Sequence, residues 1–185
     1  MLGDRLPLVH HPVLDDPVGY VTNGGSDNQI FFGAFLELLL IIANIGTAVV
    51  LYPVVKRQSE GLAIGYVTAR IVESTFILVG LISIISMVSV NEALAGATGA
   101  QAAALTAQGS SLAATYDWAF LFGPGLVVGF GNGLILGYLM YRSGLVPRRM
   151  AMFGLVGGPM LILSFGLILF GVYENGSGPA FLMAL

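Results

Sequence analysis

The sequence predicts an all-α protein, a polytopic α-helical transmembrane bundle. Of its 185 residues, 56% are hydrophobic and only 9% are charged, whereas an average soluble domain has roughly 25% charged residues. So few charges cannot cover the surface of a soluble domain of this length, whereas lipid requires an apolar exterior. Four segments are long and apolar enough to cross a bilayer, at about residues 30–55, 62–90, 118–141 and 150–173.

The N-terminal segment, residues 1–29, precedes the first span. It carries several acidic residues and prolines and has no uninterrupted apolar stretch, so it is not a signal peptide. Ser26 or Asp27 can cap the start of the first span, and Pro53 marks its end. Residues 176–185 begin another apolar run that stops far short of the roughly 20 residues that span a bilayer. We therefore expect the bundle to occupy residues 30–175 and the chain to end inside a truncated further helix.

The segment between the second and third spans, residues 91–117, is rich in Ala, Gly and Ser and is weakly amphipathic. A short surface helix and a loop would both fit this composition. We favour a partly helical outer loop that lies at the membrane interface.

Basic residues predict the orientation of the chain. They gather in two short loops, residues 56–61 and 142–149, which contain Lys56, Arg57, Arg142, Arg148 and Arg149. Cytoplasmic loops carry an excess of Lys and Arg, so these two loops should be cytoplasmic. The segment 91–117 has neither residue type, and we expect it to be extracytoplasmic together with the N-terminal segment. The sequence thus predicts a multi-pass protein of the cell membrane.

Five polar residues inside the proposed spans form the candidate ligand or ion site: Glu37, Asn44, Arg70, Glu73 and Asn132. A charge at such a depth costs about 2.5 to 3.5 kcal/mol on insertion scales, so each needs a partner. At about 1.5 Å of rise per residue, Arg70 lies about 12 Å, Glu73 about 17 Å and Glu37 about 10 Å from the nearer end of its span. We expect Arg70 to bridge the two glutamates, with the two asparagines as amide partners.

This charged layer has two interpretations. It can act as a structural clamp that fixes helix packing, in a structural or interaction membrane subunit. It can also line a polar site for permeation or sensing of a small polar solute or a proton. We prefer the second interpretation and keep the first as the alternative.

Other kinds of chemistry find little support in the sequence. His10 and His11 are adjacent and lack a helical zinc motif, and the chain has no cysteine. The serines in the spans have no nucleophile elbow, so a membrane-embedded enzyme ranks third. The formal charge of −3 and the absence of a basic stripe argue against nucleic acid. We expect no metal and no cofactor, the lipid bilayer as a partner, and further copies of the chain as an open alternative.

Four glycines repeat every four residues in the third span: Gly125, Gly129, Gly133 and Gly137. Phosphate-binding glycines require a preceding strand or a Gly-Lys-Ser/Thr sequence, and neither is present. The repeat instead predicts a ridge of small residues that lets a neighbouring helix approach closely in lipid. Asn132 lies within about 20° of the same face as Gly125, so we expect the first or second span to come within reach of its amide.

Several segments together resemble a known family. They are LELLL from Leu36, NIGTAVV from Asn44, YVTARIVE from Tyr66, Asp117-Trp118 with the glycine run, and GYLMYRSGLVPRR from Gly137. In these segments, and along nearly its whole length, the chain resembles a group of bacterial integral membrane proteins catalogued only as a domain of unknown function. The resemblance implies six helices, of which this chain would lack the first and most of the last. It implies no activity, so the site candidates come from the residues themselves.

Overall fold

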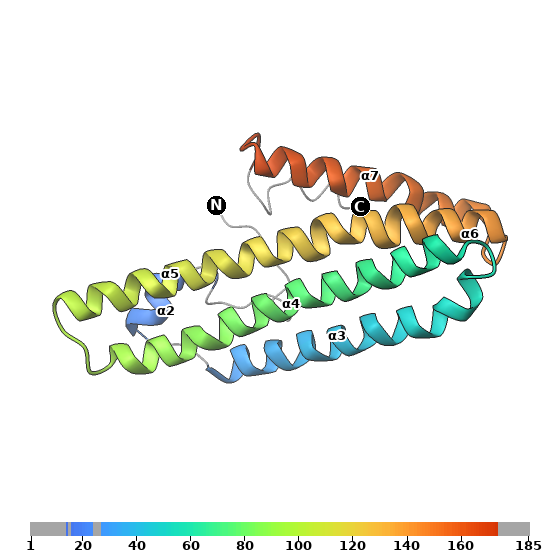
Figure 1. Cartoon of the computed structure of the whole chain (residues 1–185). Coiled ribbons are helices and arrows are strands. Elements are labelled where there is room, and N and C mark those ends of the chain that lie inside the picture. The colour runs from blue at the N-terminus through green and yellow to red at the C-terminus, as the bar shows by residue number, and fades with distance from the viewer. Residues whose placement is uncertain (1–13, 15, 24–26, 174–185) are drawn as a thin grey trace. The chain divides into compact units, whose positions relative to one another are not determined.

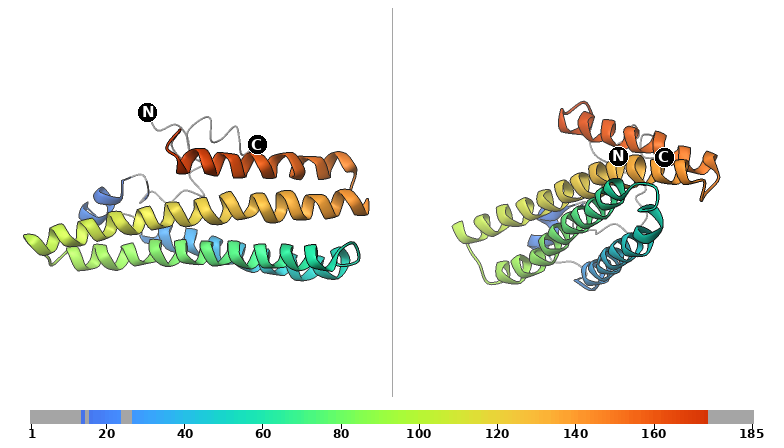
Figure 2. Two further views of the ribbon diagram at one scale, coloured as in Figure 1. Left: turned by 45° about the horizontal axis from the view of Figure 1, so that its top comes forward. Right: turned by 45° about the vertical axis from the view of Figure 1, so that its right-hand side comes forward.

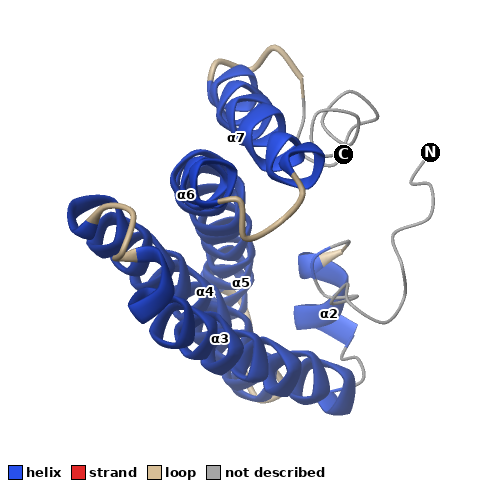
Figure 3. Ribbon diagram, turned by 90° about the vertical axis from the view of Figure 1, so that its right-hand side faces the viewer, coloured by secondary structure: helices blue, strands red, loops and turns tan. Residues whose placement is uncertain are grey.

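A computed structural model describes residues 14, 16–23 and 27–173 of the chain. In that part every regular element is helical and there is no strand (Figures 1 and 3). The elements are α2 (Pro17–Asn23), α3 (Asp27–Val55), α4 (Glu60–Leu94), α5 (Ala100–Phe120), η1 (Leu121–Val127), η2 (Gly129–Leu136), α6 (Gly137–Ser143) and α7 (Arg148–Leu169). The expected truncated helix at 176–185 and the two histidines lie outside the described residues.

Four helical stretches of the described chain are long and apolar enough to cross a membrane: Asp27–Val55, Glu60–Leu94, Ala100–Ser143 and Arg148–Leu169. The predicted fold class, all-α with four candidate spans, is confirmed. The ends of the first, second and fourth stretches lie within four residues of the expected ends.

The third stretch begins much earlier than we expected. Residues 100–117, which we interpreted as part of a partly helical outer loop, form most of α5 and continue directly into the third span. Alanine is the best helix former and is frequent in this segment. Only residues 95–99 separate α4 from α5, and Gly99 makes this turn with a positive φ of 58°.

The middle of the third stretch is a wide π-helix, not the plain α-helix that its composition suggested. The N–H of Val128 donates to the carbonyl oxygen of Gly123, and the N–H of Gly137 donates to that of Asn132, each five residues back. Pro124 has no N–H to contribute to an α-helical ladder. π-helical turns are rare in proteins, and those that occur often lie at functional sites. This segment is therefore a candidate part of the functional site.

The chain forms two compact units. The first takes Met1–Ile41 and Leu78–Ala119, and the second takes Ile42–Ile77 and Phe120–Leu185, so α3 and α4 contribute to both. In the first unit α2 is held by two hydrogen bonds. The Tyr20 hydroxyl donates to Oδ1 of Asp27 at 2.6 Å, and Nδ2 of Asn91 donates to the carbonyl oxygen of Tyr20 at 3.0 Å.

In the second unit α7 packs along η2 and α6, as both views of Figure 2 show. Val55, Ala63 and Leu139 form a buried core where the end of α3 and the start of α4 meet α6. The ring of Phe122 stacks on Phe76 with centroids 5.7 Å apart and meets Phe165 edge-on at 5.0 Å. These contacts hold η1 and α7 against α4.

Candidate functional site

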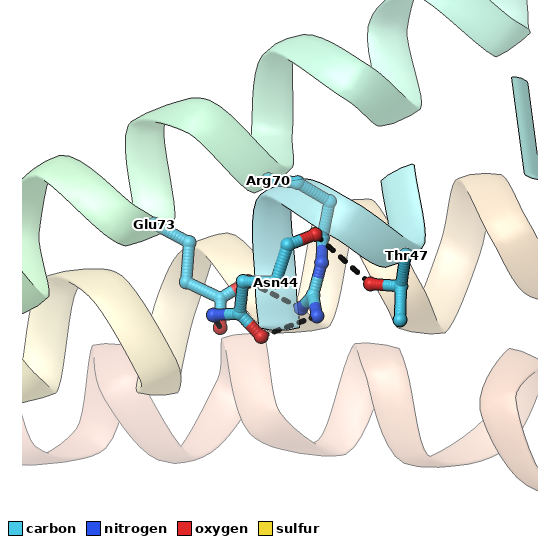
Figure 4. Close-up of polar contacts among 4 residues, drawn as sticks. All are labelled: Asn44, Thr47, Arg70 and Glu73. Carbon is cyan, nitrogen blue, oxygen red and sulfur yellow. Dashed lines mark hydrogen bonds and ion pairs between the residues drawn. The ribbon is translucent and has the colours of Figure 1, made fainter. Parts of the chain in front are cut away.

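The site is a closed ring of hydrogen bonds among three side chains of the second unit (Figure 4). Arg70 donates through Nη1 to Oε2 of Glu73 at 2.6 Å and through Nη2 to Oδ1 of Asn44 at 2.5 Å. Nδ2 of Asn44 donates to Oε1 of Glu73 at 3.0 Å, which closes the ring. All three side chains are buried, with exposed fractions between 4% and 9%.

The local sequence explains most of this arrangement. Arg70 and Glu73 are three residues apart on α4 and therefore share a helix face. Asn44 comes from α3, which a short turn connects to α4. Its amide has an NH₂ group that donates and an oxygen that accepts, so it can bond the carboxylate and the guanidinium at once. Thr47, one turn further along α3, donates its hydroxyl to the carbonyl oxygen of Asn44 at 2.9 Å (Figure 4).

The ring is electrically neutral because one guanidinium faces one carboxylate. Burying such a pair is costly unless further hydrogen bonds satisfy its remaining donors and lone pairs. Asn44 supplies one bond to each charged partner. Asn44 is thus an amide partner of both charges, as we expected.

Glu37 belongs to the first unit and has a partner there. The Tyr116 hydroxyl donates to its Oε1 at 2.5 Å, and both side chains are buried. The sequence predicts that Tyr116 lies in the outer loop, because the third span is expected to begin at about residue 118. The helix-favouring composition of residues 100–120, which form α5, was the signal that would have placed this tyrosine inside a helix. The bridge from Arg70 to Glu37 stays a prediction.

Three buried polar atoms of the second unit have no hydrogen-bond partner among the described residues. They are Nε of Arg70, Oγ of Ser74 and Oδ1 of Asn132. Arg70 and Ser74 are four residues apart, so they share a face of α4. A buried donor or acceptor without a partner costs about 1 to 3 kcal/mol, which makes each of these atoms a candidate contact for a water molecule or a small solute.

Two glycines bring the π-helical segment against α4 beside the ring. A Cβ on Gly131 would lie 2.7 Å from Cβ of Ala69, the residue before Arg70. A Cβ on Gly123 would lie 2.7 Å from Cβ of Phe76 and 3.3 Å from the carbonyl oxygen of Glu73. The backbone next to Asn132 is thus in contact with α4 one residue away from Arg70.

Three of the four glycines that we predicted as a packing ridge, Gly129, Gly133 and Gly137, face α7 and not the first or second span. A Cβ on Gly129 would lie 2.9 Å from the carbonyl oxygen of Gly158, and one on Gly133 would overlap the Cα of Gly158. A Cβ on Gly137 would lie 3.2 Å from the backbone nitrogen of Leu155. Gly125 differs from these three, because within the described chain a Cβ there would have only Leu121 and Phe120 of its own helix within 4 Å.

No group of three or more His, Cys, Asp or Glu residues that could hold a metal ion occurs in residues 14, 16–23 and 27–173. The polar contacts of the ring instead join one arginine, one glutamate and one asparagine. The ring thus consists of three hydrogen bonds, one of which is also an ion pair.

These features define a class: in its described residues the protein is all-helical, with four helices apolar enough to cross a membrane and a buried ion pair on one of them. Residues 7–185 match the family described as Domain of unknown function (DUF4386), and the chain belongs to this family. No curated protein and no solved structure matches the chain.

Proposed function

We propose that this chain is a multi-pass integral membrane protein whose second unit holds a polar site for permeation or sensing of a small polar solute or a proton. One observation carries the proposal: three buried polar atoms have no hydrogen-bond partner among the described residues. Two of them lie on α4, and the third belongs to Asn132, whose neighbour Gly131 packs against α4. Ionisable residues within apolar spans usually face a bundle interior or a water-filled cavity and mark solute or proton pathways.

The chemistry of the three atoms defines the kind of solute. Nε of Arg70 is a donor, Oδ1 of Asn132 is an acceptor and the Ser74 hydroxyl is both. A water molecule or a small solute with both a donor and an acceptor can pair with any one of these atoms. Glu73, bonded to both Arg70 and Asn44, is the group that can accept a proton if the site conducts one.

A structural clamp is the second candidate, and the closed ring favours it. Each charge already has a partner, and Asn44 joins α3 to both members of the ion pair. In this case the ring fixes how α3 and α4 pack, and the site exchanges nothing with solvent.

Water access to the site decides between these candidates. The chain has no cysteine, so single cysteines can be labelled without background. In membranes, Ser74→Cys should react with a small water-soluble thiol reagent, whereas Ser83→Cys should not. Ser74 and Ser83 lie on the same helix, with exposed fractions of 4% and 5%. The Ser83 hydroxyl, however, already donates to the backbone carbonyl oxygen of Val79. If neither cysteine reacts, the polar site is closed to water and the clamp is the better account.

Proton transfer needs a separate measurement. In vesicles that contain a pH-sensitive dye, Glu73→Gln should abolish a proton flux carried by the protein. The amide keeps the shape of the carboxylate but leaves the Arg70 cation without its anion, so the melting temperature in detergent should fall, and the flux is measured at a temperature at which both proteins are folded. Glu60→Gln is the matched control, because Glu60 is an exposed glutamate in the first turn of the same helix. An equal loss in both variants would contradict the role of Glu73.

We also propose that the protein lies in the cell membrane with residues 56–61 and 142–149 on the cytoplasmic side. The support is that five basic residues, Lys56, Arg57, Arg142, Arg148 and Arg149, lie in these two ranges, whereas residues 91–117 have none. A cysteine in place of Arg148 should therefore react with an impermeant reagent only after the membrane is opened. Labelling of this cysteine in intact cells would show that the orientation is the opposite of the one proposed.

A further inference from the structure

An open groove of about 270 Å³ lies on the second unit between the end of α3 and the start of α4. Val49 and Tyr52 line it from α3, and Ile64, Val67 and Thr68 line it from α4. Its walls are apolar apart from two hydroxyl groups. Pockets for drug-sized ligands measure roughly 300 to 1,000 Å³, so this smaller groove suits a slender apolar group such as part of an acyl chain.

A cation is held beside the groove. The ammonium group of Lys56 lies 5.5 Å from the centroid of the Tyr52 ring, a distance typical of a cation–π contact. Tyr52 therefore lines the groove and positions Lys56 at the same time. Lys56 follows α3 in the turn before α4, and both Lys56 and its neighbour Arg57 are exposed.

The location of the groove also suits a lipid. It is lined by two helices that are apolar enough to cross a membrane, and its outer side chains are exposed, Val49 at 62% and Ile64 at 51%. The end of such a helix lies at the level of the lipid headgroups, where basic residues attract anionic lipids.

We propose that this groove is a binding site for one anionic phospholipid, with part of an acyl chain between α3 and α4 and the phosphate group at Lys56. The apolar lining holds the chain, and the charge of Lys56 selects the headgroup. This site is separate in residues and in chemistry from the ring of Arg70, Glu73 and Asn44, so it stands whether or not that ring conducts a solute.

Native mass spectrometry of the full chain in detergent tests the site with two probes, phosphatidylglycerol as the anionic lipid and phosphatidylcholine as the zwitterionic lipid. Lys56→Gln removes the charge and should lower the preference for phosphatidylglycerol about fivefold, the contribution typical of one lysine near anionic lipid. Arg142→Gln is the matched control, because Arg142 is an exposed basic residue in the last turn of α6, and it should keep the wild-type preference.

Val67→Trp fills the groove and should remove the most tightly held lipid of both kinds. Val50→Trp is its control, since Val50 is 70% exposed on α3 and does not line the groove. The proposal is overturned if Lys56→Gln and Arg142→Gln change the preference equally, or if lipid is retained by Val67→Trp as by the wild type. If Val67→Trp does not fold, Ile64→Trp fills the same groove from an exposed position and gives the same two outcomes.

Discussion

Arg70 and Glu73 form a 2.6 Å ion pair within α4, and Asn44 of the preceding helix α3 bonds both partners. Because the two charges lie three residues apart on α4, they can neutralise each other before α3 and α4 pack. Asn44 then adds the contact between helices. The ion pair thus makes α4 compatible with an apolar environment, and the amide of Asn44 fixes the position of α3 beside it.

The first prediction concerns the ion pair. Arg70→Ala should lower the free energy of unfolding by about 3 to 5 kcal/mol, because it leaves the Glu73 carboxylate buried without its cation. The double variant Arg70→Leu/Glu73→Leu removes both charges and should be much closer to the wild type. Thermal melting of the purified protein in detergent measures both effects. A double variant that is less stable than Arg70→Ala would contradict this account of the pair.

The second prediction concerns the close contact between η2 and α7. Gly133→Ala should destabilise the protein by about 1 to 3 kcal/mol, the usual cost of overpacking, because the new Cβ would overlap the Cα of Gly158. Gly157→Ala is the control on the neighbouring helix, since a Cβ there meets nothing within 4 Å. This change should be neutral or should stabilise α7 by up to about 1 kcal/mol, because alanine is the better helix former. Equal melting temperatures for the two variants would argue against the packing.

The third prediction concerns the first unit. Tyr116→Phe removes the hydroxyl that donates to Oε1 of Glu37 at 2.5 Å, and it should cost about 1 to 3 kcal/mol because the acceptor remains buried. Tyr138→Phe is the control at a tyrosine that is 42% exposed, and it should leave the stability within about 0.5 kcal/mol of the wild type. Melting in detergent again provides the comparison. No difference between the two variants would show that the bond contributes nothing.

The fourth prediction is a pH dependence in α2, outside the four candidate spans. Burial of the Tyr20 phenol, followed by its hydrogen bond to Asp27, raises the pKa of Tyr20 well above its ordinary value of 10.0. A raised pKa means that the fold favours the protonated phenol. The stabilisation is therefore complete below about pH 10, the ordinary pKa of tyrosine, and declines as the pH rises above it.

Tyr20→Phe tests this dependence. The wild type should be more stable than Tyr20→Phe by about 1 kcal/mol from pH 8 to pH 10, and the difference should shrink at higher pH. Melting curves of both proteins in the same detergent, taken at steps between pH 8 and pH 11, give the difference at each pH. A difference that stays constant or grows above pH 10 would contradict the proposed bond.

The candidate site was predictable to the extent that its contacts are local. Arg70 and Glu73 share a helix face by their spacing alone, and a buried charge requires a partner. The bond between Glu37 and Tyr116 joins residues 79 positions apart. No periodicity links two such residues, and the alanine-rich composition before Tyr116 obscured the start of its helix.

The sequence by itself determined that the chain is helical, which segments are apolar enough to span a membrane, and that the charges on α4 must be paired. Helical periodicity and the cost of burying charge are sufficient for these conclusions. Only the tertiary structure decided that Asn44 completes the ring, that Gly129, Gly133 and Gly137 face α7, and that the third span widens into a π-helix. A repeat defines a face of a helix, but the neighbour that covers this face depends on how all the helices pack together.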